Sequence, residues 1–380
     1  KMYLTLNLIK NVKFHNNILL PLQTTFHRMS SSQKVTEILK YDKDPGPYFL
    51  DESVQKLLRS ITQLHLDKIF RKRTVPNNTI EYKFLTTEEV ENEIKVATRN
   101  AMERLQMPPI VQVLNDEQKI LSNDPALSKL DKSDFVFTDI TYGLKDTERT
   151  IVIRRANGVL ENAPFDVRKR LNQIYFPLKG RRVRTPKMFE PEYLEKCLDN
   201  FYYEFILDRL CIQFEPFEQQ YHDVCSAVYQ HVNANKRFDD LRSTRHFGPM
   251  AFFFAWHKMI DDLLIEMVKK DCLTNAVELI VLMYRLNEKN DKSDILEKVK
   301  SYEAAVQKEK QTQSDDIHEF VEKTSSQFKM DDCCLEYLND YIKNDALKKV
   351  QLELAVQSYK EINDQKKTLA EGLKKAHGVN

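Results

Sequence analysis

Residues 249–286, PMAFFFAWHKMIDDLLIEMVKKDCLTNAVELIVLMYRL, carry apolar side chains at helical spacing in two runs, 249–268 and 273–286. A short connection between two such runs favours neighbouring antiparallel helices, so this stretch predicts a helical hairpin. Its aromatic side chains belong either to the core of that hairpin or to an interface with a partner. The candidates for partner contact are Phe252, Phe253, Phe254 and Trp256.

The helical pattern continues towards the amino end of this stretch. Apolar side chains recur at helical spacing in 193–214 and in 217–232, with short connections between the runs. A further helix is expected from Pro164 onward. The apolar face of that helix would consist of Val167, Leu171, Ile174 and Tyr175. Closely spaced helices of this kind predict a bundle of antiparallel hairpins.

Two more helices are predicted nearer the amino end. Asp51 can cap the first of them, because an aspartate side chain accepts a hydrogen bond from the first helical N–H groups. Its apolar stripe is Val54, Leu57, Leu58, Ile61 and Leu64. Thr86 and Glu89 form a capping-box pair before the second helix, which the prolines at 108 and 109 would end. Its apolar stripe is Val90, Ile94, Ala97, Ala101 and Leu105.

The middle of the chain has a different pattern. Residues 135–142 and 149–155 are rich in β-branched and aromatic side chains, which is typical of strands. Asn157-Gly158 then favours a tight hairpin turn into a third strand that begins at Val159. We therefore predict a predominantly α-helical fold of helical hairpins, with a small three-stranded antiparallel β element in the middle.

The amino-terminal stretch is basic and contains no acidic residue before Glu37. Basic, hydroxyl-rich and acid-free amino ends are typical of mitochondrial transit peptides. The alternative is a secretory signal with an apolar run at 2–9. Lys10 and Lys13 follow that run closely, and unpaired cysteines fit secretion poorly. We therefore expect the protein to be located in the mitochondrial matrix. Because no later run reaches about 18 uncharged apolar residues, we expect no membrane span.

These patterns divide the chain into six segments. They are a transit peptide and linker at 1–44, an N-terminal helical segment at 45–134, the β element at 135–163, a helical-hairpin domain with a basic loop at 164–287, a charged connector at 288–313 and C-terminal helices at 314–380.

Several classes of enzyme are disfavoured. Glycine makes up 7 of 380 residues, and neither G-x-G-x-x-G nor G-x-x-x-x-G-K-[ST] occurs, so the usual phosphate-cradling loops are missing. The six cysteines form no C-x-x-C pair, which disfavours a zinc site. His257 and Asp261 could form a general-base pair, but such a pair is more often a simple surface hydrogen bond. We expect no enzymatic activity, no cofactor, no metal and no small-molecule substrate.

The strongest local charge lies in residues 164–187, which hold eight basic side chains and one acid, whereas the whole chain has a formal net charge of +1. Its second half, 179–187, has the composition of a loop. Arginine binds phosphate oxygens in a bidentate manner, and a loop can follow an irregular RNA backbone. The alternatives are a solvated basic surface or a patch for an acidic protein. The candidates for RNA contact are Arg168, Lys169, Lys179, Arg181, Arg182, Arg184 and Lys187.

A second basic group supplies two further candidates for RNA contact, Arg242 and Arg245. Hydroxyl side chains stand between these arginines, and both kinds of group bind phosphate. Asp239 and Asp240 precede them, so an internal salt-bridged corner is the favoured alternative.

Six segments carry a resemblance to a known family. They are FLDESVQ at 49–55, MPP at 107–109, FVFTDITY at 135–142, QIYFP at 173–177, QFEP at 213–216 and DLRSTRHFG at 240–248. In this order they resemble the mitochondrion-specific small-subunit ribosomal proteins that carry the number twenty-two. The resemblance extends from about Phe49 to about Leu286. It departs from the family at Pro249, where family members have a second glycine.

This resemblance implies a structural constituent of the mitochondrial small ribosomal subunit, packed against neighbouring ribosomal proteins and small-subunit rRNA to support translation. It implies no catalytic residues, and it strengthens Arg242, Arg245 and the 179–187 loop as candidates for contact. One alternative is a free mitochondrial RNA-processing or translation factor of helical-hairpin type. A second alternative is a matrix enzyme that uses His257 and Asp261.

Overall fold

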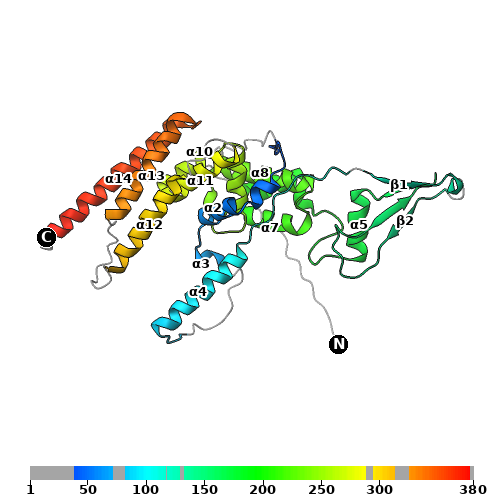
Figure 1. Ribbon diagram of the computed structural model, residues 1–380, viewed down its shortest axis with the longest axis horizontal. Helices are drawn as coiled ribbons and strands as arrows, with labels where there is room; N and C mark the ends of the chain where they lie inside the picture. Colours follow the sequence, from blue (N-terminus) through cyan, green and yellow to red (C-terminus); the bar gives the residue numbers. More distant parts are fainter. Residues whose placement is uncertain are drawn as a thin grey trace, which may run out of the picture. The chain divides into compact units, whose positions relative to one another are not determined.

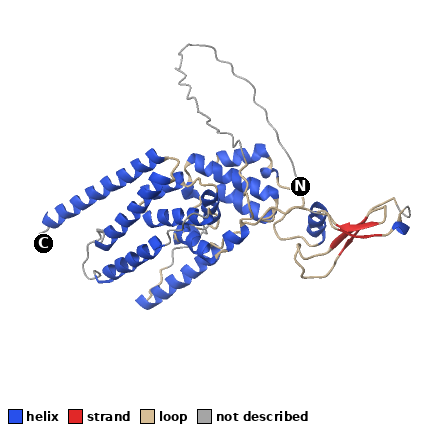
Figure 2. Cartoon of the chain, turned by 45° about the horizontal axis from the view of Figure 1, so that its top comes forward, coloured by secondary structure: helices blue, strands red, loops and turns tan. Residues whose placement is uncertain are grey.

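A computed structural model describes residues 38–71, 82–116, 118–128, 132–287, 294–312 and 325–376 (Figures 1 and 2). Within these ranges the chain forms fourteen α-helices and one four-stranded antiparallel sheet. The predominantly helical fold with a small β element is therefore confirmed. The predicted transit peptide lies outside the described residues, except for the linker from 38 to 44.

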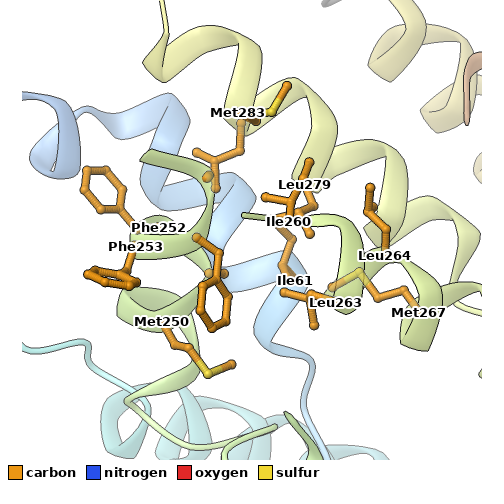
Figure 3. Close-up of a cluster of buried hydrophobic side chains, with 14 of the residues drawn as sticks. Ile61, Met250, Phe252, Phe253, Ile260, Leu263, Leu264, Met267, Leu279 and Met283 are labelled. Carbon is orange, nitrogen blue, oxygen red and sulfur yellow. The ribbon is translucent and has the colours of Figure 1, made fainter. Parts of the chain in front are cut away.

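The core is built around α9 (Phe247–Trp256), in which every residue is buried. A helix that is apolar on all sides has no face suited to water and must be enclosed by other elements. Here α2 (Glu52–Thr62) and α11 (Leu273–Leu286) pack against it, and α10 (Asp261–Lys269) packs on α11. Figure 3 shows side chains from all four helices in this one buried cluster, among them Ile61 of α2, Phe252 of α9, Leu263 of α10 and Leu279 of α11.

Two predicted helices are each broken into two. Residues 249–268 were expected to be continuous, but α9 ends at Trp256 and α10 begins at Asp261, because Lys258 adopts a left-handed conformation with φ of 57°. In the same way, 193–214 divides into α6 (Pro191–Asp199) and α7 (Tyr203–Gln213) at Phe201, with φ of 58°. Helix α8 (Gln219–Asn235) follows and packs against α7.

The amino-terminal helices follow their capping signals. After α1 (Gly46–Leu50), Asp51 caps α2 by accepting a hydrogen bond from the N–H of Val54 at 3.2 Å. The short α3 (Leu66–Ile69) packs against α4 (Thr87–Arg104). The predicted capping box at the start of α4 is present in full.

The sheet has the strand order β1-β4-β3-β2. Its strands are β1 (Ile120–Asn123), β2 (Phe135–Thr138), β3 (Ile151–Arg154) and β4 (Val159–Asn162). One face packs on α5 (Phe165–Tyr175), where Val167 and Leu171 contact Ile151 and Ile153. The other two residues predicted for this helix face, Ile174 and Tyr175, are exposed.

Strand β1 was not predicted. All four of its residues are exposed, so the alternation of buried and exposed side chains that marks a half-buried strand does not develop there. The predicted turn at Asn157-Gly158 is present, and Gly158 has φ of 87°. A Cβ atom on Gly158 would lie 2.1 Å from the carbonyl oxygen of Asp124, so the close approach of β1 to this turn requires glycine.

The carboxyl-terminal helices are α12 (Asp294–Thr312), α13 (Ser325–Asn344) and α14 (Lys349–Ala376). Most of the expected charged connector is therefore helical, and α12 packs against α13. Helix α13 in turn packs on α11, and α14 packs on α10. Asp261 fixes the start of α14 by accepting a hydrogen bond from the N–H of Leu347 at 2.7 Å. Among the described helices, none combines the length and apolar character needed to cross a membrane.

Candidate nucleic-acid interface

The basic loop, residues 179–187, is held in place by side chains of α7. The buried Gln213 accepts a hydrogen bond from the N–H of Arg182 at 3.1 Å and donates one to its carbonyl oxygen at 2.8 Å. Arg209 donates to the carbonyl oxygen of Gly180 at 2.8 Å, and Gln173 of α5 donates to that of Arg181 at 3.0 Å. The loop backbone is therefore fixed by three side chains at its first turn.

Arg181 points inward from this loop. Its side chain is 7% exposed and forms ion pairs with Glu215 and with Asp146, the latter at 3.8 Å. It also donates a hydrogen bond to the carbonyl oxygen of Ile212 at 3.2 Å. Arg181 was a candidate for RNA contact, but the structure places its guanidinium among the carboxylates of this chain. Its role is to attach the loop to the helical core.

The remaining cations of the loop point outward. Lys179, Arg182, Arg184 and Lys187 are exposed. Among the described residues, none of these four side chains has an ion-pair partner or a hydrogen-bonded acceptor. The loop therefore presents unneutralised positive charge on a backbone that is already ordered. This combination suits a phosphate backbone, because little conformational freedom is lost when the contact forms.

The cations of α5 divide in the same way. Lys169 is 25% exposed, pairs with Glu218 and lies 4.9 Å from the ring centre of Phe214. Arg168 is half-buried and donates to the carbonyl oxygen of Thr147 at 3.4 Å. Both predicted candidates are thus engaged within the chain. Arg170, which sequence reasoning left out of the candidates, is exposed on the same helix.

The second basic group is an internal corner, as the favoured alternative predicted. The Arg242 side chain is 6% exposed and pairs with Asp239 at 3.1 Å and Glu266 at 3.3 Å. Arg245 pairs with Asp208 at 2.7 Å. Burial alone would raise the pKa of Asp208, but a hydrogen bond from His246 and the charge of Arg245 outweigh it and lower this pKa to about 2.

The aromatic run lies in the core rather than at a surface. Phe252, Phe253 and Phe254 are at most 2% exposed, and Trp256 is 8% exposed (Figure 3 shows Phe252 and Phe253). The indole N–H of Trp256 donates to Asp42 at 2.8 Å. Of the two interpretations offered for this run, core and partner interface, the structure supports the core.

His257 and Asp261 do not form a pair. The helix breaks between them, so His257 is the C-cap residue that follows α9, and burial lowers its pKa. Asp261 accepts hydrogen bonds from the Tyr341 hydroxyl at 2.6 Å and from the backbone at the start of α14. Within the described ranges, no group of three or more His, Cys, Asp or Glu side chains could hold a metal ion. All six cysteines are free thiols.

Sequence reasoning missed the residues that hold the basic loop in position. Gln213 and Arg209 lie on α7, about thirty residues from the loop they hold. An isolated polar residue at a helical core position was the available signal, because a buried amide needs hydrogen-bond partners.

Comparison with known proteins identifies the family. A family model described as mitochondrial 28S ribosomal protein S22 matches residues 47–288. The chain is 36% identical over 241 residues to small ribosomal subunit protein mS22 of Mus musculus, which covers 63% of this chain and 67% of that protein. The protein of the same name from Bos taurus matches with the same identity and coverage. The matched region includes the sheet, the basic loop and the core from α2 to α11, and the chain therefore belongs to the mitochondrial 28S ribosomal protein S22 family.

Proposed function

We propose that this chain is a structural constituent of the small subunit of the mitochondrial ribosome, where other ribosomal proteins and rRNA surround it. Membership of the family across residues 47–288 supports this role and a mitochondrial location. The same membership supports a structural rather than an enzymatic role.

The finer part of the proposal is that the basic loop contacts rRNA. Four outward cations on a loop fixed by buried Gln213 are the observation that carries it. Neutralising phosphates releases condensed counterions, so each such contact contributes a salt-dependent attraction. We assign this contact to Lys179, Arg182, Arg184 and Lys187, with Arg170 on the neighbouring helix.

The inward cations have a different role in this proposal. Arg181, Lys169, Arg242 and Arg245 are each paired with a carboxylate of this chain, and a cation that has a carboxylate partner has less attraction left for phosphate. We therefore propose that they stabilise the fold and that they hold the outward cations in position.

Salt extraction of small subunits tests the RNA contact. Subunits that contain the tagged Arg182→Ala/Arg184→Ala variant are washed with increasing KCl, and the released protein is measured. We expect release at a lower salt concentration than for the wild type, since two phosphate contacts are removed. The matched control is Lys343→Ala/Lys360→Ala, which removes two exposed lysines from α13 and α14.

The control should be released at the wild-type salt concentration. Equal release of both double variants and the wild type would contradict RNA contact by the loop. A protein that never sediments with subunits, with or without substitution, would instead favour the free RNA-processing or translation factor.

A further inference from the structure

Helix α4 carries an apolar stripe that the described part of the chain leaves largely uncovered. Val90 and Ile94 are 42% and 53% exposed, although their helical spacing is that of a core-facing stripe. Towards the end of the helix the same stripe turns inward, and Ala101 is fully buried. There Arg104 lies 4.7 Å from the ring centre of Phe70, the residue that follows α3. Figure 1 shows α3 beside α4. The helix is therefore anchored by its last turns.

The uncovered surface continues into the residues before the helix. Tyr82 and Phe84 are almost fully exposed, and Leu85 is 47% exposed. Leu85 directly precedes the N-cap, and Val90 is the fourth helical residue, so the two occupy the positions of a hydrophobic staple. The staple sets the direction in which the chain enters the helix. Apolar groups from 82–85 and from the first two turns of α4 thus belong to one contiguous stretch.

The start of α4 is built without help from a partner. The N–H of Glu89 donates to the Thr86 hydroxyl at 3.3 Å, and the N–H of Thr86 donates to the Glu89 carboxylate at 2.8 Å. A capping box satisfies two N–H groups that a helix start leaves free. Helices in proteins nevertheless gain most of their stability from packing an apolar face. An exposed stripe on a well-capped helix therefore indicates a surface that a partner covers.

The charge around the stripe identifies the kind of partner. Glu88, Glu89, Glu91 and Glu93 lie between Thr86 and Ile94, and this stretch holds no lysine or arginine. Among the described residues, Glu88, Glu91 and Glu93 have no cationic partner. Four carboxylates repel phosphate, so rRNA is disfavoured here, in contrast to the basic loop. A partner with lysine or arginine beside its apolar side chains matches both features.

We propose that residues 82–85 and the first half of α4 form a docking site for another protein, through an apolar segment flanked by lysine or arginine. This inference rests on the proposed function in one respect, which is that the partner belongs to the small ribosomal subunit. Apolar side chains of the partner cover Leu85, Val90 and Ile94. Its cations lie against the glutamates and fix the orientation of the segment.

Photocrosslinking within purified small subunits tests this site. The photoreactive amino acid p-benzoylphenylalanine replaces Ile94 in one tagged protein, and in a control protein it replaces Leu354, an exposed residue of α14. We expect the probe at 94 to crosslink to one ribosomal protein, at a peptide with apolar residues flanked by lysine or arginine. The control probe should not crosslink to that peptide. A crosslink from position 94 to rRNA, to residues 1–37 of this chain, or to nothing would overturn the inference.

A charge variant tests the acidic part of the site. Replacing Glu88, Glu91 and Glu93 by glutamine keeps the size of the side chains and removes three charges. We expect the crosslink from position 94 to weaken several-fold at low salt, and an unchanged yield would refute the role of charge. Failure of this inference is separable from failure of the proposed function, because sedimentation of the probe-bearing protein with subunits is measured on the same sample.

Discussion

The neighbouring arginines 181 and 182 should respond to alanine substitution in opposite ways. Arg181 is 7% exposed and is paired with Glu215 and Asp146. Breaking a fully buried ion pair costs about 3–5 kcal/mol, and because these carboxylates keep 30% and 25% exposure, we expect about 2–3 kcal/mol for Arg181→Ala. At about 2 °C per kcal/mol for a protein of this size, its Tm should fall by about 4–6 °C.

Arg182 has an exposed side chain that no described residue engages. Arg182→Ala should therefore change the free energy of unfolding by no more than about 0.5 kcal/mol. It should, however, weaken binding to a transcript of the mitochondrial small-subunit rRNA. Loss of one phosphate contact lowers the slope of log affinity against log salt by about 0.7–0.9, so the ratio of wild-type to variant affinity should fall about threefold between about 50 and 200 mM salt.

Two measurements on the purified full chain separate the roles. Thermal unfolding reports stability, and equilibrium binding to the transcript at several KCl concentrations reports the salt slope. Arg181→Ala should lower Tm and keep the slope, because Gln213 and Arg209 still hold the loop. Arg182→Ala should lower the slope and keep Tm. If Arg181→Ala reduced the slope while Tm stayed constant, the assignment of inward and outward cations would be refuted.

Three further substitutions test the core, the sheet and the internal corner around Arg245. Phe254→Ala should destabilise the isolated protein by about 3–5 kcal/mol in urea unfolding, because the side chain is fully buried; a change below about 1 kcal/mol would restore the partner-interface interpretation. Gly158→Ala should lower Tm, since its Cβ would lie 2.1 Å from the carbonyl oxygen of Asp124, and an unchanged Tm would contradict the close approach of β1. The folded-state pKa of Asp208, about 2, lies below its unfolded value of about 3.9. The charged carboxylate therefore stabilises the fold above about pH 4, and this contribution is lost as pH falls towards about 2. Asp208→Asn should therefore cost about 2 kcal/mol at pH 7 and clearly less at pH 3 in urea unfolding, and an equal cost at both pH values would contradict the cause given for the pKa.

Local signals predicted the helices that depend on local chemistry. The aspartate cap of α2 and the capping box of α4 are both present, and α11 has the predicted bounds, Leu273–Leu286. The breaks at Phe201 and Lys258 were missed, because residues other than glycine that adopt positive φ carry little sequence signal. Helix α12 was missed because its strongly charged sequence suggested a connector, whereas in the fold it packs against α13.

The candidate site was predictable as a list of cations but not as a surface. Sequence shows that 179–187 is basic, and it cannot show which arginine meets a carboxylate from a distant segment. Arg181 is separated from Asp146 and Glu215 by more than thirty residues each way, and Arg245 is equally far from Asp208. The folded chain decides these pairings. The exposure of the apolar stripe on α4 was likewise not predictable, because its spacing is that of a core-facing stripe and only the folded chain shows that Val90 and Ile94 remain exposed.

The central claim is that the chain is a stable part of the mitochondrial small ribosomal subunit. Sedimentation of tagged protein from lysed mitochondria on a sucrose gradient, with and without RNase, tests it most directly. We predict that the protein migrates with small-subunit rRNA and that RNase shifts it to slower fractions. Slow sedimentation as a free protein, unchanged by RNase, would contradict the claim.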